Sequence, residues 1–270
     1  MKSLFASAFL AATALPALAT TPGYTPLSGA DPVGRIYDYT RSNRDGSLPE
    51  HIVVYRKSVT EVAVFKAIDP CTTAAYVTSV LDPQTLEATT LYAGKLNRDG
   101  TQRVFGRMDL DPATRVITAK IDLPDAQLSD TATAPDAPWH LYDYDLATLT
   151  VTLPHLTDPK ADFSIGMALV VTDDMSDFLT YMGRTDVRYV GEETRKGQAT
   201  RRYDVGGLAF GNKGGPLWLD AKNGHIVDAE FGIPNHAEYA DFKLKLNRVS
   251  DGGEAEWNSL LRAHYTGCPR

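Results

Sequence analysis

The sequence predicts a mainly β protein: a large antiparallel curved sheet, a half-barrel or barrel, with two or three short helices covering it. Apolar and polar residues alternate with a period of two over many short runs, which is typical of antiparallel strands with one buried face. Three-residue turns that end in glycine separate several of these runs, as in hairpins. So many strands would curl, split or close rather than stay flat. The turns are Arg44-Asp45-Gly46, Arg98-Asp99-Gly100, Arg195-Lys196-Gly197 and Lys222-Asn223-Gly224.

The alternating runs give the expected strands in chain order. The pattern is clearest from position 242 to position 247, where every even residue is apolar and every odd residue is polar. Asp-Pro pairs at 69–70, 82–83, 111–112 and 158–159 lie between runs, where turns are expected to begin. The expected strands are Val33–Thr40, His51–Lys57, Thr60–Ile68, Ala75–Leu81, Ala88–Asn97, Thr101–Asp111, Arg115–Leu123, Ser164–Val171, Asp186–Thr194, Thr200–Gly206, Pro216–Ala221, His225–Phe231 and Asp241–Val249.

Three segments depart from this period. Asp174–Met182 and Glu254–His264 place apolar residues at i, i+3, i+4 and i+7, which predicts amphipathic helices. Leu146–Leu153 fits a helix by its leucine spacing and a strand by its Thr and Val content, and Pro154 ends it in either case. Pro124–Pro138 is rich in Ala, Asp, Thr and Pro and is the best candidate for an internal loop, a possible division of a single domain over residues 20–270.

The first 19 residues have the order of a secretory signal peptide. Lys2 provides a basic start, Leu4–Leu15 an apolar stretch, and Ala17-Leu18-Ala19 a small-residue cleavage site. A buried N-terminal helix is the alternative. We therefore expect cleavage after Ala19 and a soluble periplasmic or secreted protein without a transmembrane segment.

The net charge of the chain disfavours some classes of binding partner, and its cysteine content is relevant to the cellular compartment. The formal net charge of −7 disfavours nucleic acids and anionic membranes, which are bound by basic surfaces. Cys71 and Cys268 are the two cysteines of the chain, and export would allow them to form a disulfide bond. Two buried free thiols are the alternative. Oligomeric state is left open.

The C-terminal third contains a recognisable meander. GGPLWLDAKNGHIVDAEFG runs from Gly214 to Gly232, and YADFKLKL follows from Tyr239. With its Asn-Gly turn and alternating final strand, the stretch 201–249 resembles the periplasmic lipoprotein-carrier (LolA/LolB-like) half-barrel proteins. The resemblance implies a concave face that binds acyl chains, and so a carrier of an apolar ligand.

The residues themselves show no catalytic signature. The sequence has no G-x-S-x-G, H-E-x-x-H or P-loop motif. Along His225–Phe231, strict alternation places Asp228 and Glu230 with Ile226 on a solvent face, and His225 with Val227 and Phe231 on the core face. Because the carboxylates then point away from the histidine, no metal site is predicted, and no cofactor either.

The expected function is non-enzymatic binding or carriage of an acyl- or lipid-like ligand. Methionines are suited to surfaces that accept variable apolar partners, and aromatic side chains line such cavities, although both also fill ordinary cores. The alternative is a secreted hydrolase whose catalytic site assembles in space. The candidate cavity or lid residues are Met175, Phe178, Leu179, Met182, Trp218, Val227 and Phe231.

Overall fold

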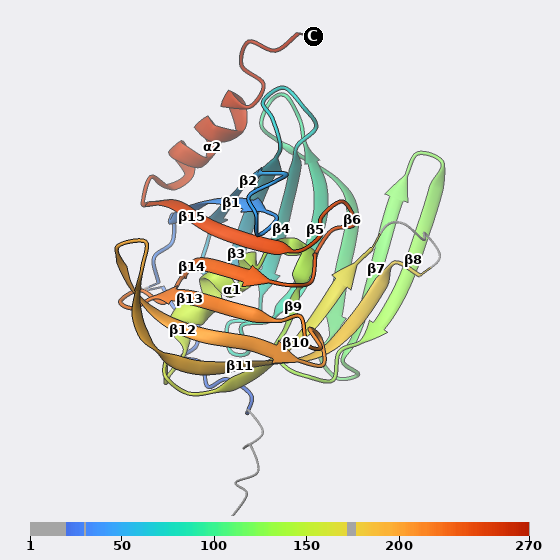
Figure 1. The fold of residues 1–270 in the computed structure, drawn as a ribbon. Coiled ribbons are helices and arrows are strands. Elements are labelled where there is room, and N and C mark those ends of the chain that lie inside the picture. The colour runs from blue at the N-terminus through green and yellow to red at the C-terminus, as the bar shows by residue number, and fades with distance from the viewer. Residues whose placement is uncertain (1–19, 30, 172–176, 270) are drawn as a thin grey trace, which may run out of the picture.

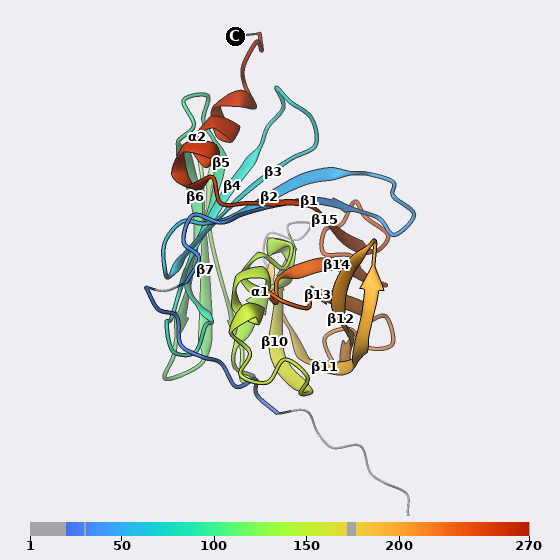
Figure 2. The ribbon, with the colours of Figure 1, turned by 90° about the vertical axis from the view of Figure 1, so that its left-hand side faces the viewer.

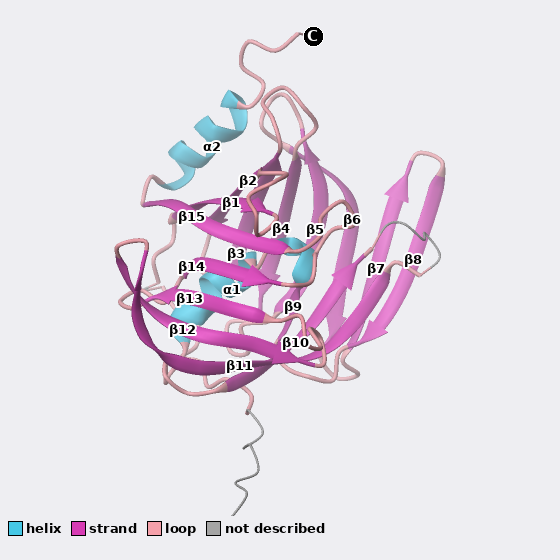
Figure 3. Cartoon of the chain, viewed as in Figure 1, coloured by secondary structure: helices cyan, strands magenta, loops and turns pink. Residues whose placement is uncertain are grey.

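One continuous sheet of 15 strands dominates the computed structural model, which describes residues 20–29, 31–171 and 177–269 (Figures 1 and 3). The predicted signal peptide, residues 1–19, lies outside these ranges. The strands are β1 (Ile36–Ser42), β2 (Glu50–Arg56), β3 (Glu61–Ala67), β4 (Ala75–Leu81), β5 (Ala88–Leu96), β6 (Gln102–Asp111), β7 (Val116–Leu123), β8 (Ala126–Thr133), β9 (Trp139–Leu141), β10 (Phe163–Val170), β11 (Leu179–Arg195), β12 (Gln198–Gly207), β13 (Gly215–Asp220), β14 (Ile226–Phe231) and β15 (Phe242–Ser250). The helices are η1 (Tyr142–Tyr144), α1 (Ala147–Thr152), η2 (Leu153–His155) and α2 (Gly253–Ala263).

The strand order is β8-β7-β6-β5-β4-β3-β2-β1-β15-β14-β13-β12-β11-β10-β9. Hairpins connect most neighbours, and β15 returns to pair with β1 from Ile36↔Ser250 to Ser42↔Lys243. Every pair is antiparallel except β9 with β10. The sheet curls until β11, close to one end, approaches β8 at the other end, and the backbone N–H of Leu179 donates to the Asp130 side chain of β8 over 2.8 Å. No strand ladder joins these ends in the described chain, so the curved sheet is open.

The predicted fold class is confirmed, and so are the four glycine turns. Gly46, Gly100, Gly197 and Gly224 have φ values of +89°, +88°, +80° and +76°, in the left-handed region that glycine adopts without steric cost. α2 forms where a helix is predicted, and the ambiguous segment 146–153 forms α1 and part of η2.

Two predictions of local structure are wrong. Of the predicted helix Asp174–Met182, residues 174–176 lie outside the described ranges, and Leu179–Met182 is not helical but begins β11, where Leu179 pairs with Val170 and Thr180 with Leu169. The ladder with β10 outweighs the helical spacing, because a neighbouring strand satisfies the backbone hydrogen bonds along the segment. The expected loop 124–138 contains β8, paired with β7 from Val116↔Thr133 to Leu123↔Ala126. The parts of the chain on either side of it belong to the same sheet.

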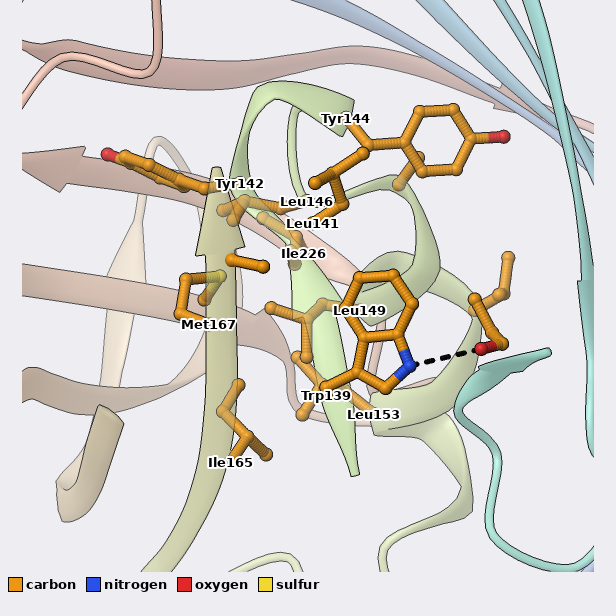
Figure 4. Close-up of a cluster of buried hydrophobic side chains, with 14 of the residues drawn as sticks. Trp139, Leu141, Tyr142, Tyr144, Leu146, Leu149, Leu153, Ile165, Met167 and Ile226 are labelled. Carbon is orange, nitrogen blue, oxygen red and sulfur yellow. Dashed lines mark hydrogen bonds between the residues drawn. The ribbon is translucent and has the colours of Figure 1, made fainter. Parts of the chain in front are cut away.

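A compact segment from β9 through η2 fills part of the concave side (Figure 2). Figure 4 shows Trp139, Leu149 and Leu153 in one cluster of buried hydrophobic side chains with Ile165 of β10. The indole Nε1 of Trp139 donates to the carbonyl oxygen of Ala88 over 3.1 Å and so connects this segment to β5. All six residues of α1 are buried. This short helix therefore owes its stability to packing inside the sheet rather than to its own length.

The helix α2 covers the other face of the sheet, over β2–β4 (Figures 1 and 2). Trp257 stacks on Tyr55 with ring centroids 5.1 Å apart, and Leu261 joins the same buried cluster. The predicted disulfide between Cys71 and Cys268 is present and holds the end of the chain beside the segment that precedes β4. None of the helices in the described ranges is long and apolar enough to cross a bilayer.

Candidate functional site

A cavity of about 340 Å³ lies on the concave side, between β3–β7 and the segment Leu141–Tyr144. Its walls are mostly apolar, and Phe178 and Val170 close one side. A hollow of this size and composition falls in the range of small-molecule sites. The apolar wall is formed chiefly by Val77, Leu91, Met108, Ile121, Leu141 and Phe178.

Small inward-facing residues explain why the sheet leaves space here. Ala93 of β5 is the cross-strand neighbour of Gly106 of β6, which in turn pairs with Ile121 of β7. Two further small residues, Ala75 and Ala119, also line the cavity. A Cβ at Gly106 would lie 3.3 Å from the Cβ of Ala93. Since neighbouring strands are spaced by their hydrogen bonds, short side chains on adjacent strands leave a hollow.

One end of the cavity is charged. Glu50, Lys66, Asp143, His236 and Glu238 all line it. Alternation along β2 and β3 places Glu50 and Lys66 on the concave face: Ile52 and Val54 share the face of Glu50, and Val62 and Val64 share that of Lys66. The other three residues come from η1 and from the loop between β14 and β15. The site thus combines segments that are distant in sequence.

Asp145 organises the basic side chains behind this end. Its fully buried carboxylate forms an ion pair with Lys66 and accepts a hydrogen bond from the Asn235 side-chain amide over 2.7 Å. Asn235 in turn accepts from the fully buried Arg41, whose guanidinium carbon lies 2.8 Å above the Tyr239 ring centroid. The Lys66 ammonium also donates to the Asp143 carbonyl oxygen over 2.5 Å.

The backbone at Asp145 is unusual. Asp145 and Leu146 have φ values of 50° and 58°, so two successive residues with side chains adopt the left-handed region. Such a conformation costs free energy and occurs where the surrounding structure requires it. Here it ends η1, starts α1 and allows the Asp145 carboxylate to meet Lys66.

Burial shifts the ionisation of several groups at the charged end. Burial raises the pKa of Asp143 to about 6, and the positive charge of Lys66 opposes the shift. Burial, followed by the negative charge of Asp145, also raises the pKa of Glu50. Burial and nearby Lys66 lower the pKa of His236 to about 4, so its imidazole is neutral at pH 7. For Asp145, burial acts to raise the pKa, but the positive charges of Lys66 and Arg41 outweigh it, and the pKa is lowered.

The structure separates the predicted site residues into groups. Phe178 lines the cavity; Leu179 and Phe231 belong to the concave core, and Met182 packs against it. Trp218 lies on the opposite face from Leu217 and Leu219, and its indole N–H donates to Glu193. Val227 is buried but belongs to neither hydrophobic cluster of the described chain. Met175 lies outside the described residues, and ligand binding by the set stays a prediction.

No sequence motif indicates the charged end, although two residues of the sequence carry a signal for it. Glu50 and Lys66 occupy positions that the period-two pattern assigns to the apolar face of β2 and β3. A charged residue on a buried strand face is rare without a partner or a function. The partners, Asp143, Asp145 and His236, have no such pattern in their own segments.

The hairpin β13–β14 differs from its prediction at two residues, Ile226 and Asp228. The register shifts between Trp218 and Leu219, so Ile226 pairs with Leu219 and Asp228 with Trp218. Ile226 therefore joins the concave core instead of sharing a face with the acidic residues. Asp228 is not exposed either, because Arg195 and Lys196 bind its fully buried carboxylate over 2.9 and 2.7 Å. No group of three metal-binding side chains occurs within the described ranges.

Comparisons with known proteins add little to this geometry. No family model and no curated protein matches the chain. Among solved structures, a porin-like protein from Bacteroides uniformis aligns with 85% of this chain and 99% of its own length, at 11% sequence identity and a TM-score of 0.21. A similarity at this level supports no conclusion about fold or function.

Proposed function

We propose that this protein binds an acyl- or lipid-like ligand in the cavity on the concave side of its sheet, without catalysing a reaction. The observation that carries the proposal is the apolar cavity of about 340 Å³, formed where the inward-facing residues of the sheet are alanine and glycine and not larger side chains. The resemblance of residues 201–249 to lipoprotein carriers points in the same direction, as does the leader-like sequence 1–19, which fits a carrier outside the cytoplasm.

Filling the cavity tests this function. The probe is N-phenyl-1-naphthylamine, an uncharged apolar dye whose fluorescence rises in apolar surroundings. We expect the wild-type protein to bind it and Ala93→Leu to bind it at least about tenfold more weakly, since the added side chain occupies the hollow next to Gly106.

The matched control is Ala126→Leu, at an exposed position of β8. It should bind the dye as the wild-type protein does, and circular dichroism should show that all three proteins are folded. Absence of dye binding by the wild-type protein, or equal binding by a folded Ala93→Leu variant, would refute the proposed function.

Hydrolysis is a second candidate because of one group. A carboxyl with a pKa of about 6, such as Asp143, is partly protonated near neutral pH and is suited to acid–base chemistry. If the protein hydrolyses acyl esters there, Asp143→Asn abolishes the activity. If no ester of varied chain length is turned over by the wild-type protein, this candidate is discarded.

A further inference from the structure

The charged end of the cavity contains both signs of charge, but its two buried cations are already engaged. Lys66 is held by the Asp145 carboxylate and the Asp143 carbonyl oxygen. Arg41 contacts Asn235 and lies over the Tyr239 ring. Asp145 also lies 4.0 Å from Arg41, so the two cations share one buried carboxylate, and the nearby acids Glu50 and Glu238 add to the negative charge around them.

The acidic side chains that line the cavity have fewer hydrogen-bond and ion-pair partners than these two cations. Glu50 and Glu238 line the cavity, and within the described chain their carboxylates form no ion pair or hydrogen bond, although the charges of Lys66 and Arg41 act on Glu50. Asp143 lines it as well, and its carboxylate accepts from the backbone N–H of Val170 over 3.3 Å. Burial lowers the pKa of His236 to about 4, so its imidazole is neutral at pH 7. Arg107 and Lys120 also line the cavity, but alternation along β6 and β7 places their side chains on the opposite face from Met108 and Ala119, and Arg107 pairs with Asp109 over 2.6 Å.

This arrangement discriminates between head groups. An anionic head would enter beside Glu50, Asp143 and Glu238, and apolar walls strengthen the repulsion because they replace water. Among the described residues, four acids meet two cations here, namely Glu50, Asp143, Asp145 and Glu238 against Lys66 and Arg41, so a positively charged nitrogen at the same place would offset the acidic excess and donate hydrogen bonds to the Glu50 oxygens. We propose that the ligand is an amphipathic amine, with its apolar part in the cavity and its cationic nitrogen at Glu50. This inference rests on the proposed function.

A pair of ligands that differ in charge alone tests the inference. Dodecylamine and dodecanoate, below their aggregation concentrations at pH 7.5, are titrated by calorimetry and by displacement of N-phenyl-1-naphthylamine. We expect the amine to bind at least about tenfold more tightly than the carboxylate. Glu50→Gln should remove most of that preference while the affinity for the neutral dye stays the same.

The control is Glu192→Gln, an exposed strand glutamate that pairs with Lys160 over 2.8 Å, far from the cavity lining. It should leave the amine preference intact. Equal affinities for the two ligands, tighter binding of dodecanoate, or an unchanged preference in a dye-binding Glu50→Gln variant would overturn the head-group inference. In each of these cases, continued dye binding by the wild-type protein would leave the proposed function standing, whereas loss of dye, amine and carboxylate binding together would refute both.

Discussion

At the scale of single residues, buried charge has the largest consequences in this protein. Asp145 satisfies Lys66 and Asn235 and lies near Arg41, whereas Asp143 keeps a carboxylate beside an apolar hollow. The first arrangement compensates a buried charge with partners, and the second leaves part of the desolvation cost uncompensated. The two acids, separated by Tyr144, are therefore expected to respond oppositely to pH.

Asp143→Asn tests the cost of burying this carboxylate. The folded pKa of about 6 lies above the ordinary value of 3.8, so the folded protein binds more protons than the unfolded chain between these values. Stability from this group is fully present below about pH 4 and is lost as the pH rises through 6. The variant does not ionise, so we expect its free energy of unfolding relative to wild type to increase by about 1–3 kcal/mol between pH 4 and pH 7.5.

Urea denaturation at a series of pH values measures the difference. Asp122→Asn, at an exposed position of β7, is the control and should show a smaller change. A stability difference between Asp143→Asn and wild type that stays constant over this range would contradict burial as the cause.

Gly224 combines two constraints in the hairpin β13–β14. Its φ is +76°, and a Cβ there would lie 2.8 Å from the Cα of Pro154, just after α1. Gly46 has a similar φ of +89° but open space around it. We expect Gly46→Ala to cost about 1–2 kcal/mol for the left-handed backbone, and Gly224→Ala to cost at least about 1 kcal/mol more. Thermal unfolding of both variants measures the difference; equal costs would show that the contact with Pro154 is unimportant.

At the scale of elements, sequence pattern predicted structure well where local and tertiary preferences agree. α2 has apolar residues on one face and one sheet surface to cover, and it forms as predicted. The stretch around Leu179 carries a helical spacing as well, but β10 offers it a complete ladder. For β8, the composition suggests a loop, and pairing with β7 is what makes it a strand. Such pairing depends on a neighbour that the local sequence does not specify.

The contribution of α2 to the free energy of unfolding is expected to come mainly from one side chain, that of Trp257. Trp257 is 2% exposed and contacts Tyr55 and Tyr76. Trp257→Ala should lower the free energy of unfolding by about 3–5 kcal/mol, because it removes a large buried side chain. Glu254→Ala, at an exposed position of the first turn, is the control and should change stability by less than about 1 kcal/mol. Chemical denaturation measures both, and similar effects would mean that α2 packs only loosely on the sheet.

At the scale of the whole molecule, the disulfide closes a loop over most of the chain. Cys71 and Cys268 are 197 residues apart in sequence, and α2 lies between β15 and the second cysteine. Replacing both with serine should reduce the free energy of unfolding by about 2–5 kcal/mol, because the unfolded chain gains freedom. Urea denaturation of the double variant and of wild type with and without reductant measures this. Equal stability of all three would show that the cross-link is not needed once α2 has docked.

The fold class, the turns and the one disulfide pair that two cysteines allow could be predicted from the sequence, and the structure confirms them. Alternation, glycine in turns and cysteine number are local or compositional properties, and each has a physical meaning that does not require a neighbour. The charged end of the cavity could be predicted only in part, since Glu50 and Lys66 stand out on an apolar strand face while their partners do not.

The position of the cavity and the identity of its lining residues follow from the tertiary structure and could not be predicted from local sequence. Ala93 and Gly106 form part of the cavity wall because β5 pairs with β6 in one register. The segment from β9 through η2 leaves the space in front of them unfilled. The curvature of the sheet around η1 brings together Glu50, Lys66, Asp145 and His236. The Asp145 backbone adopts a left-handed conformation that the side-chain pattern of the sequence does not predict. These relations depend on sheet curvature and strand register, which are properties of the whole chain and not of any one segment.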